Sequence, residues 1–76
     1  MATIQVYKHG TSILLGTGEG VIDTGNKTAV INAWTTRAGL VVEQNYKLKS
    51  GGKTYSDAVC IAVNVAPPLA TFNNVS

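Results

Sequence analysis

The sequence predicts an all-β fold: a single small antiparallel barrel or sandwich of five or six strands built from hairpins, with an extended C-terminal arm. Apolar and polar residues alternate with a period of two along most of the 76 residues, which is the pattern of strands with one buried face. Glycine-containing turn sequences separate the alternating segments. Together these segments leave almost no room for a helix or a catalytic loop.

The first predicted hairpin lies near the start of the sequence. Ile4 and Val6 alternate with polar neighbours until His9-Gly10 interrupts the pattern. A two-residue turn at His9-Gly10 pairs Val6 with Ile13 and Ile4 with Leu15, which gathers apolar side chains on one face. We therefore expect two short strands joined by a tight turn.

The next part of the sequence contains a glycine-rich segment, a turn and a third strand. Glycine at every second position of residues 16–20 offers no side chain to pack and suggests a bend or a bulge. Residues 23–26 have the composition of a turn. Residues 28–35 predict a strand with apolar side chains on both faces, so we expect both faces to be at least partly covered.

The longest predicted hairpin turns at Gly51-Gly52. A two-residue turn there places Leu48 opposite Tyr55 and makes one face apolar. The same register gives three further pairs, which are Gln44 with Val59, Val42 with Ile61, and Leu40 with Val63. A three-residue loop would put Lys49 opposite Lys53, so both charge repulsion and lost burial favour the even-length loop.

The last ten residues differ in character from the rest of the chain. Pro67-Pro68 cannot continue a β-ladder, so we divide the chain into an all-β domain, residues 1–66, and an extended C-terminal arm, residues 67–76. The arm has no charged residue. Its large apolar residues are Leu69, Phe72 and Val75. Because disordered tails are seldom this apolar, we expect an ordered arm that docks on a neighbouring subunit, with docking on the same chain as the alternative.

Composition narrows the functional classes. The chain has 45% hydrophobic residues, ten charged residues and a net charge of +2, which is less charge than monomers normally keep on their surface. The net charge is too small to indicate nucleic-acid or membrane binding. One cysteine cannot form an internal disulfide, and no secretory leader or apolar stretch of about 20 residues is recognisable. We expect the protein to fold in the cytoplasm, with incorporation into a virion or an extracellular assembly.

The short motifs do not favour enzymatic chemistry. Gly52, Lys53 and Thr54 match the end of a phosphate-binding loop, but Lys47 occupies the position of its first glycine and a strand follows instead of a helix. His9 is the only histidine in the chain. The four acids, Glu19, Asp23, Glu43 and Asp57, are spread along the sequence. We therefore expect no catalytic residue, no cofactor, no metal site and no small-molecule ligand.

A strip of small side chains on the last long strand is the first candidate binding surface. Ala58, Cys60 and Ala62 lie behind larger valine and isoleucine residues, and either a partner subunit or a second sheet of the same chain can cover them. We assign the subunit interface to this strip together with the apolar residues of the arm. The predicted interface residues are Ala58, Cys60, Ala62, Leu69, Phe72 and Val75.

Three lysines near the Gly51-Gly52 turn are the second candidate surface. Lys47, Lys49 and Lys53 could contact nucleic-acid phosphates beside a stacking aromatic residue. The alternation, however, places the lysines on the face opposite Tyr46 and Tyr55. The tyrosines are therefore expected to pack inward, which leaves this surface as the alternative assignment.

These observations favour a non-enzymatic structural or interaction module in a repeating assembly. Phage capsid and decoration proteins, other virion proteins and filament subunits include chains of this size and composition, so a virion structural protein is our first expectation. Its partner would be the protein itself or another structural subunit, with no membrane partner and weak or no nucleic-acid binding. The alternative is a small nucleic-acid-binding barrel of the oligonucleotide-binding or Sm-like kind.

Overall fold

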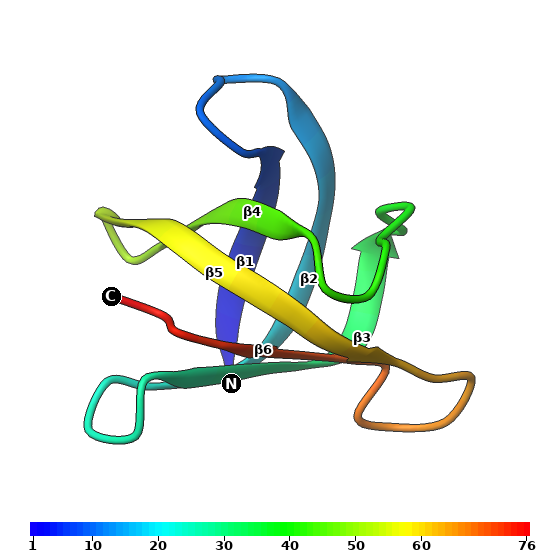
Figure 1. Ribbon diagram of the computed structural model, residues 1–76. Coiled ribbons are helices and arrows are strands. Elements are labelled where there is room, and N and C mark those ends of the chain that lie inside the picture. Colours follow the sequence, from blue (N-terminus) through cyan, green and yellow to red (C-terminus); the bar gives the residue numbers. More distant parts are fainter.

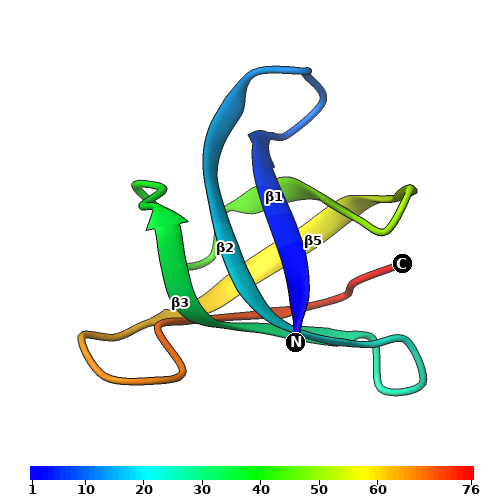
Figure 2. The same cartoon turned by 180° about the vertical axis from the view of Figure 1, so that it is seen from behind.

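The computed structural model describes residues 1–76 and contains six strands and no helix. The strands are β1 (Ala2–Lys8), β2 (Leu14–Asp23), β3 (Thr28–Thr36), β4 (Asn45–Ser50), β5 (Lys53–Val63) and β6 (Ala70–Asn73). They form a closed barrel in the order β1-β2-β3-β6-β5-β4 (Figure 1; Figure 2 from behind). The antiparallel all-β fold predicted from the sequence is confirmed, and it is a barrel and not a sandwich.

The barrel encloses a single core of 13 buried residues. Its largest fully buried side chains include Phe72, Ile4, Ile31 and Leu48, which come from four different strands. The rings of Tyr46 and Phe72 meet edge to face with 6.3 Å between their centroids, an arrangement that aromatic pairs prefer. Because the contributing strands lie all around the ring, this core forms only when the barrel closes.

The loop between β1 and β2 is longer than the sequence predicted. The Lys8 N–H donates to the Ile13 carbonyl at 3.0 Å, and the Thr11 hydroxyl donates to the Lys8 carbonyl at 2.8 Å. As a result, Val6 pairs with Gly16 instead of Ile13. The prediction of a two-residue turn is wrong because the Thr11 side chain and backbone build a wider loop.

Gly16, Gly18 and Gly20 lie inside β2 and are buried. A Cβ atom on Gly18 would lie 2.6 Å from Ile31 Cγ2, and one on Gly20 would lie 1.8 Å from the Val30 carbonyl oxygen. Glycine therefore allows β2 to approach β3 while it curves around the barrel (Figure 1). The register with β3 shifts twice along this stretch, so the expected irregularity is present, but within a continuous strand.

The turn predicted at residues 23–26 is confirmed. Asp23 accepts a hydrogen bond from the Asn26 side-chain amide at 2.8 Å and another from the Asn26 backbone N–H at 3.1 Å. Both bonds stabilise the charged carboxylate, and the side-chain bond has the larger effect. They hold the pKa of the Asp23 carboxyl below its ordinary value. β3 follows, with Ala29 and Ile31 buried and Val30 half-buried on the outer face.

The Gly51-Gly52 hairpin has the predicted register next to its turn. Leu48 pairs with Tyr55, and both glycines have positive φ, 58° and 80°, as a two-residue hairpin turn requires. The register then shifts, because β5 has one extra residue, so that Ala58 pairs with Tyr46. Beyond this bulge the predicted register no longer holds.

The predicted pairs beyond the bulge are therefore wrong. Val59 pairs with Asn45 and not with Gln44. Residues 37–44 form a loop instead of a continuation of β4, so the pairs Val42 with Ile61 and Leu40 with Val63 do not form a ladder. This loop still contacts β5, because the Glu43 N–H donates to the Cys60 carbonyl at 2.7 Å.

Residues 67–76 do not form a separate arm. Pro67-Pro68 lies between strands, as expected, but β6 then inserts between β3 and β5, where Phe72 pairs with both Ala29 and Cys60 (Figure 1). Val75 is buried as well, and its N–H donates to the Lys27 carbonyl at 2.9 Å. The segment completes the barrel of its own chain, because its alternating apolar residues are core residues.

Candidate interaction surfaces

Two of the three residues of the predicted interface strip, Ala58 and Cys60, face the inside of the barrel, whereas Ala62 pairs with Thr71 on the outer side. Ala58 and Cys60 are completely buried, while Ala62 is half-buried at a register shift between β5 and β6. The bulge in β5 is the cause, since one extra residue exchanges the inner and outer faces of the strand as far as the second register shift, which lies between Cys60 and Ala62. The sequence left open whether a partner subunit or the same chain covers this strip, and in the structure the same chain covers Ala58 and Cys60.

The apolar residues assigned to the arm are also used within the chain. Phe72 and Val75 are core residues, and Leu69 is half-buried, with its N–H donating to the Ile31 carbonyl at 2.7 Å. These side chains are therefore not free to meet a neighbouring subunit.

The burial of Cys60 in the barrel raises the pKa of its thiol above the ordinary value.

The same bulge turns Ile61 outward, and two further large apolar side chains are exposed at the end of β5 and just beyond it, although Val63 pairs with the buried Ala70. Ile61 is 44% exposed, Val63 is 38% exposed and Val65 is 96% exposed. On the neighbouring strands Val30 pairs with Thr71 of β6 on one side and with Val21 of β2 on the other. Thr71 in turn pairs with Ala62 of β5, so a continuous outer row of Val21, Val30, Thr71 and Ala62 runs beside the exposed Ile61.

This part of the surface carries no charge. Neither β3 nor any residue from 58 to 76 is Lys, Arg, Asp or Glu. The outer side of β3, β6 and the second half of β5 is therefore uncharged, and we call it the uncharged face. Its outward or partly exposed side chains are Val30, Thr71, Val59, Ile61, Val63 and Val65. Val42, 47% exposed, lies in the loop that bonds to β5.

A basic surface lies on β1 and β4. Tyr7 pairs with Lys47, and Gln5 pairs with Lys49. The Nζ atoms of Lys47 and Lys49 lie 5.3 and 5.6 Å from the Tyr7 ring centroid, within the range of a cation–π interaction. The Tyr7 hydroxyl donates to Gln5 Oε1 at 3.2 Å. We call these four residues, Gln5, Tyr7, Lys47 and Lys49, the lysine face.

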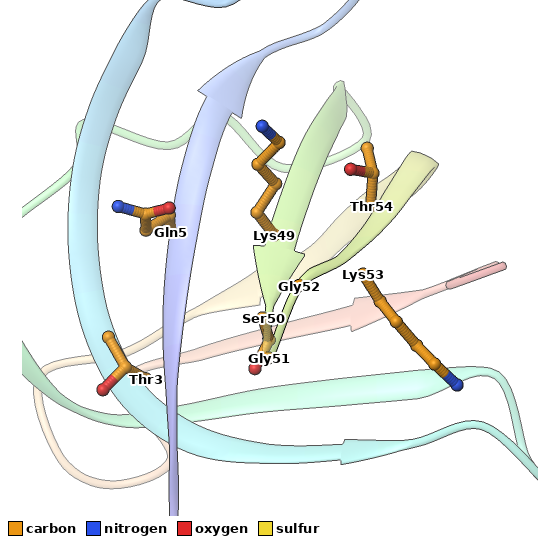
Figure 3. Close-up of a pocket in the computed structure, with 8 residues that line it drawn as sticks. All are labelled: Thr3, Gln5, Lys49, Ser50, Gly51, Gly52, Lys53 and Thr54. Carbon is orange, nitrogen blue, oxygen red and sulfur yellow. The ribbon is translucent and has the colours of Figure 1, made fainter.

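A polar groove adjoins the lysine face. It has a volume of about 380 Å³ and forms because β4 pairs with β1 only from Gln5 onward, which leaves Thr3 without a neighbour on that side. Figure 3 shows that the side chains of Lys49 and Lys53 extend in opposite directions from the hairpin. The lining residues are Thr3, Gln5, Lys49, Ser50, Gly51, Gly52, Lys53 and Thr54.

The structure thus brings two of the three predicted lysines together and separates the third. Tyr46 and Tyr55 are buried, as the alternation predicted. The aromatic residue beside the lysines is Tyr7, which no local sequence pattern connects with them because it lies 40 positions from Lys47. Only the pairing of β1 with β4 reveals this contact.

The remaining polar side chains include one ion pair. His9 Nε2 lies 2.9 Å from Asp57 Oδ1 at an exposed position, beside a second hollow of about 510 Å³ lined by Lys8, His9, Glu43, Gln44 and Asn45. No group of three or more His, Cys, Asp or Glu residues comes together in a way that could hold a metal ion.

No family model matches the chain, and no curated protein or solved structure is significantly similar to it. The structure also contains no helix with the length and hydropathy needed to cross a membrane. The surfaces described above are therefore the basis for a functional assignment.

Proposed function

We propose that this protein is a non-enzymatic structural subunit that associates with copies of itself through the uncharged face, as part of a repeating assembly such as a virion shell or its decoration. The observation that carries the proposal is the exposure of three large apolar side chains, Ile61, Val63 and Val65, on a part of the surface without charge. The centres of protein interfaces are depleted in charged residues, and contiguous exposed apolar patches often mark interaction sites.

The size of the barrel is compatible with such a contact. A standard interface buries about 800 Å² on each partner, and the whole accessible surface of the chain is 4220 Å². One interface would thus occupy about a fifth of the surface. Three of the six strands border the uncharged face, so it has room for a contact of this size.

The energetics favour many weak contacts over one strong contact. Complete burial of an aliphatic side chain contributes about 1.5 to 3 kcal/mol, and Ile61 and Val63 are already more than half covered. The remaining gain must also offset about 4 kcal/mol or more of lost translational and rotational freedom. A weak pairwise contact becomes stable when a lattice repeats it, because each subunit is then held at several sites.

The assignment to a virion rests on the small size, the all-β fold and the low charge of the chain. A filament of the same subunit would use the same surface and the same physics. In either assembly the partner is this protein itself.

Sedimentation velocity over a range of protein concentrations tests the proposal. The wild type should associate as its concentration rises. Ile61→Lys should remain a folded monomer, because association would bury an unpaired ammonium group. Ile13→Lys is the matched control, since Ile13 is 57% exposed in the β1–β2 loop, and it should associate like the wild type. A wild type that stays monomeric throughout, or an Ile61→Lys variant that assembles normally, would overturn the proposal.

A further inference from the structure

The lysine face and the uncharged face lie on different strands of the barrel. In the closed strand order, β1 and β4 are neighbours, β1 lies directly across the barrel from β6 and β4 directly across from β3, while β5 pairs with β4. A subunit that associates through the β3 and β6 side therefore keeps β1 and β4 accessible. The two surfaces also differ in chemistry, so they suit different partners.

The two lysines of the lysine face lack an anionic partner. Lys47 and Lys49 are two positions apart on the same side of β4, which separates their Cα atoms by about 7 Å. The one ion pair of the chain joins His9 and Asp57, so neither lysine has a carboxylate within reach. Two like charges this close repel each other, and an anion with more than one charged group would relieve that repulsion.

Tyr7 adds an aromatic ring to this charged surface. The ring is half-buried on the outer side of β1, with both ammonium groups near it. Lysine side chains are flexible enough to move from the ring to nearby phosphates, and a flat base can then stack on the ring. A ring beside several cations is the combination with which proteins hold a single strand of nucleic acid.

We propose that the lysine face binds single-stranded nucleic acid, with Lys47 and Lys49 against phosphates and the Tyr7 ring against a base. Lys53, which lines the adjoining groove but extends away from Lys49, would contact a phosphate further along the strand. The polar groove beside Lys49 would take the sugar-phosphate chain, since its lining contains no acidic residue. This inference does not depend on self-association through the uncharged face.

The chemistry of the lysine face favours nucleic acid over other polyanions. An anionic bilayer would also use exposed aliphatic side chains beside the cations, and Leu14, which pairs with Tyr7 and is 49% exposed, is one such side chain. The groove beside Lys49, however, is otherwise lined by threonine, serine, glutamine, glycine and Lys53, which offer a bilayer no apolar contact. An acidic peptide would engage the ammonium groups and leave the ring without a role. A nucleic-acid strand uses both the charges and the ring.

The binding should be weak and strongly salt-dependent. If three phosphates are engaged, the slope of log affinity against log salt is about −2 for a single strand. Raising the salt from about 50 to 200 mM then weakens binding about 20-fold. This agrees with the weak binding expected from the small net charge, and it assigns that binding to one face.

Fluorescence anisotropy with a labelled oligothymidylate of about 16 nucleotides tests the inference. The double variant Lys47→Gln/Lys49→Gln should reduce the magnitude of the salt slope to about 0.7, the value for one phosphate. The control Lys27→Asn/Arg37→Gln removes the same net charge outside the lysine face and should keep the wild-type slope. Equal slopes in the two double variants would overturn the inference.

The role of the ring needs its own pair of variants. Tyr7→Leu should weaken binding about tenfold at fixed salt, because a stacked base is lost, whereas Tyr7→Phe should bind like the wild type. Inorganic polyphosphate and phosphatidylserine vesicles serve as competing probes. If either one binds at least as tightly as the oligonucleotide, or if Tyr7→Leu has no effect, the partner is not single-stranded nucleic acid.

Discussion

Replacement of Gly20 by alanine should strongly destabilise the barrel. Gly20 is buried in β2 opposite Ile31 of β3. An added Cβ atom would lie 1.8 Å from the Val30 carbonyl oxygen, 2.8 Å from the Val30 carbonyl carbon and 3.0 Å from the Ile31 Cα atom. All three atoms belong to the backbone, so no side-chain rotation relieves the clash, and β2 and β3 must separate.

The size of the effect follows from this geometry. Overpacking of a well-packed interior costs about 1 to 3 kcal/mol, and a required backbone movement puts Gly20→Ala near the upper value. For a domain of this length each kcal/mol lowers the melting temperature by about 4 to 8 °C. We therefore expect the melting temperature to decrease by about 12 to 24 °C. The corresponding loss of about 3 kcal/mol is a large part of the unfolding free energy of a small domain.

Thermal unfolding followed by circular dichroism measures this decrease. Gly39→Ala is the matched control, because Gly39 has no atom within 4 Å of an added Cβ and no positive φ. That variant should melt at or slightly above the wild-type temperature, since alanine restricts the unfolded chain. If Gly20→Ala melted at the same temperature as Gly39→Ala, the close packing of β2 against β3 would be refuted.

Three further predictions test other parts of the fold. Phe72→Ala should lower the unfolding free energy of the monomer by about 3 to 5 kcal/mol in urea denaturation; unchanged stability would mean that β6 is dispensable. Insertion of one alanine between Gly51 and Gly52 should lower the melting temperature, because the turn sets the Leu48–Tyr55 register, and an unaltered melting temperature would contradict this. Cys60 should react with a thiol reagent at neutral pH only as fast as the barrel opens, because the thiol is buried with a raised pKa; rapid labelling of the native protein would show that this part of β5 faces outward.

The sequence predicted the fold class because alternation and turn chemistry are local signals. The Gly51-Gly52 turn and the Leu48–Tyr55 pair follow from residues that are neighbours along the chain, and both are present. The same local reasoning was wrong at the β1–β2 loop, where one threonine that bonds to Lys8 lengthens the connection.

The assignment of inner and outer faces on β5 failed for a physical reason. Alternation tells which residues share a face, but a single extra residue exchanges the two faces without changing the composition. Residues 58–63 are apolar at every position, so nothing in the sequence reveals where the exchange occurs. The predicted interface at Ala58 and Cys60 therefore became core, and Val59 and Ile61 turned toward the surface.

The candidate sites show the same division between local and long-range information. The outward direction of Lys47 and Lys49 followed from their alternation with Tyr46 and Leu48 within one strand, and the burial of Tyr46 confirms it. The proximity of Tyr7 depends on how β1 and β4 pair when the barrel closes. Closure joins strands that are far apart in sequence, and no local pattern encodes it.

Methyl NMR during a concentration series tests the central claim most directly, because it reports which side chains become covered when the protein associates. We predict that, at concentrations where association begins, the methyl signals of Ile61 and Val63 shift or broaden first, whereas those of Ile13 and Leu14, which are exposed near the β1–β2 loop, stay unchanged. Signals that respond first at Ile13 and Leu14, or that do not respond at any concentration, would contradict the assignment of the uncharged face as the assembly surface.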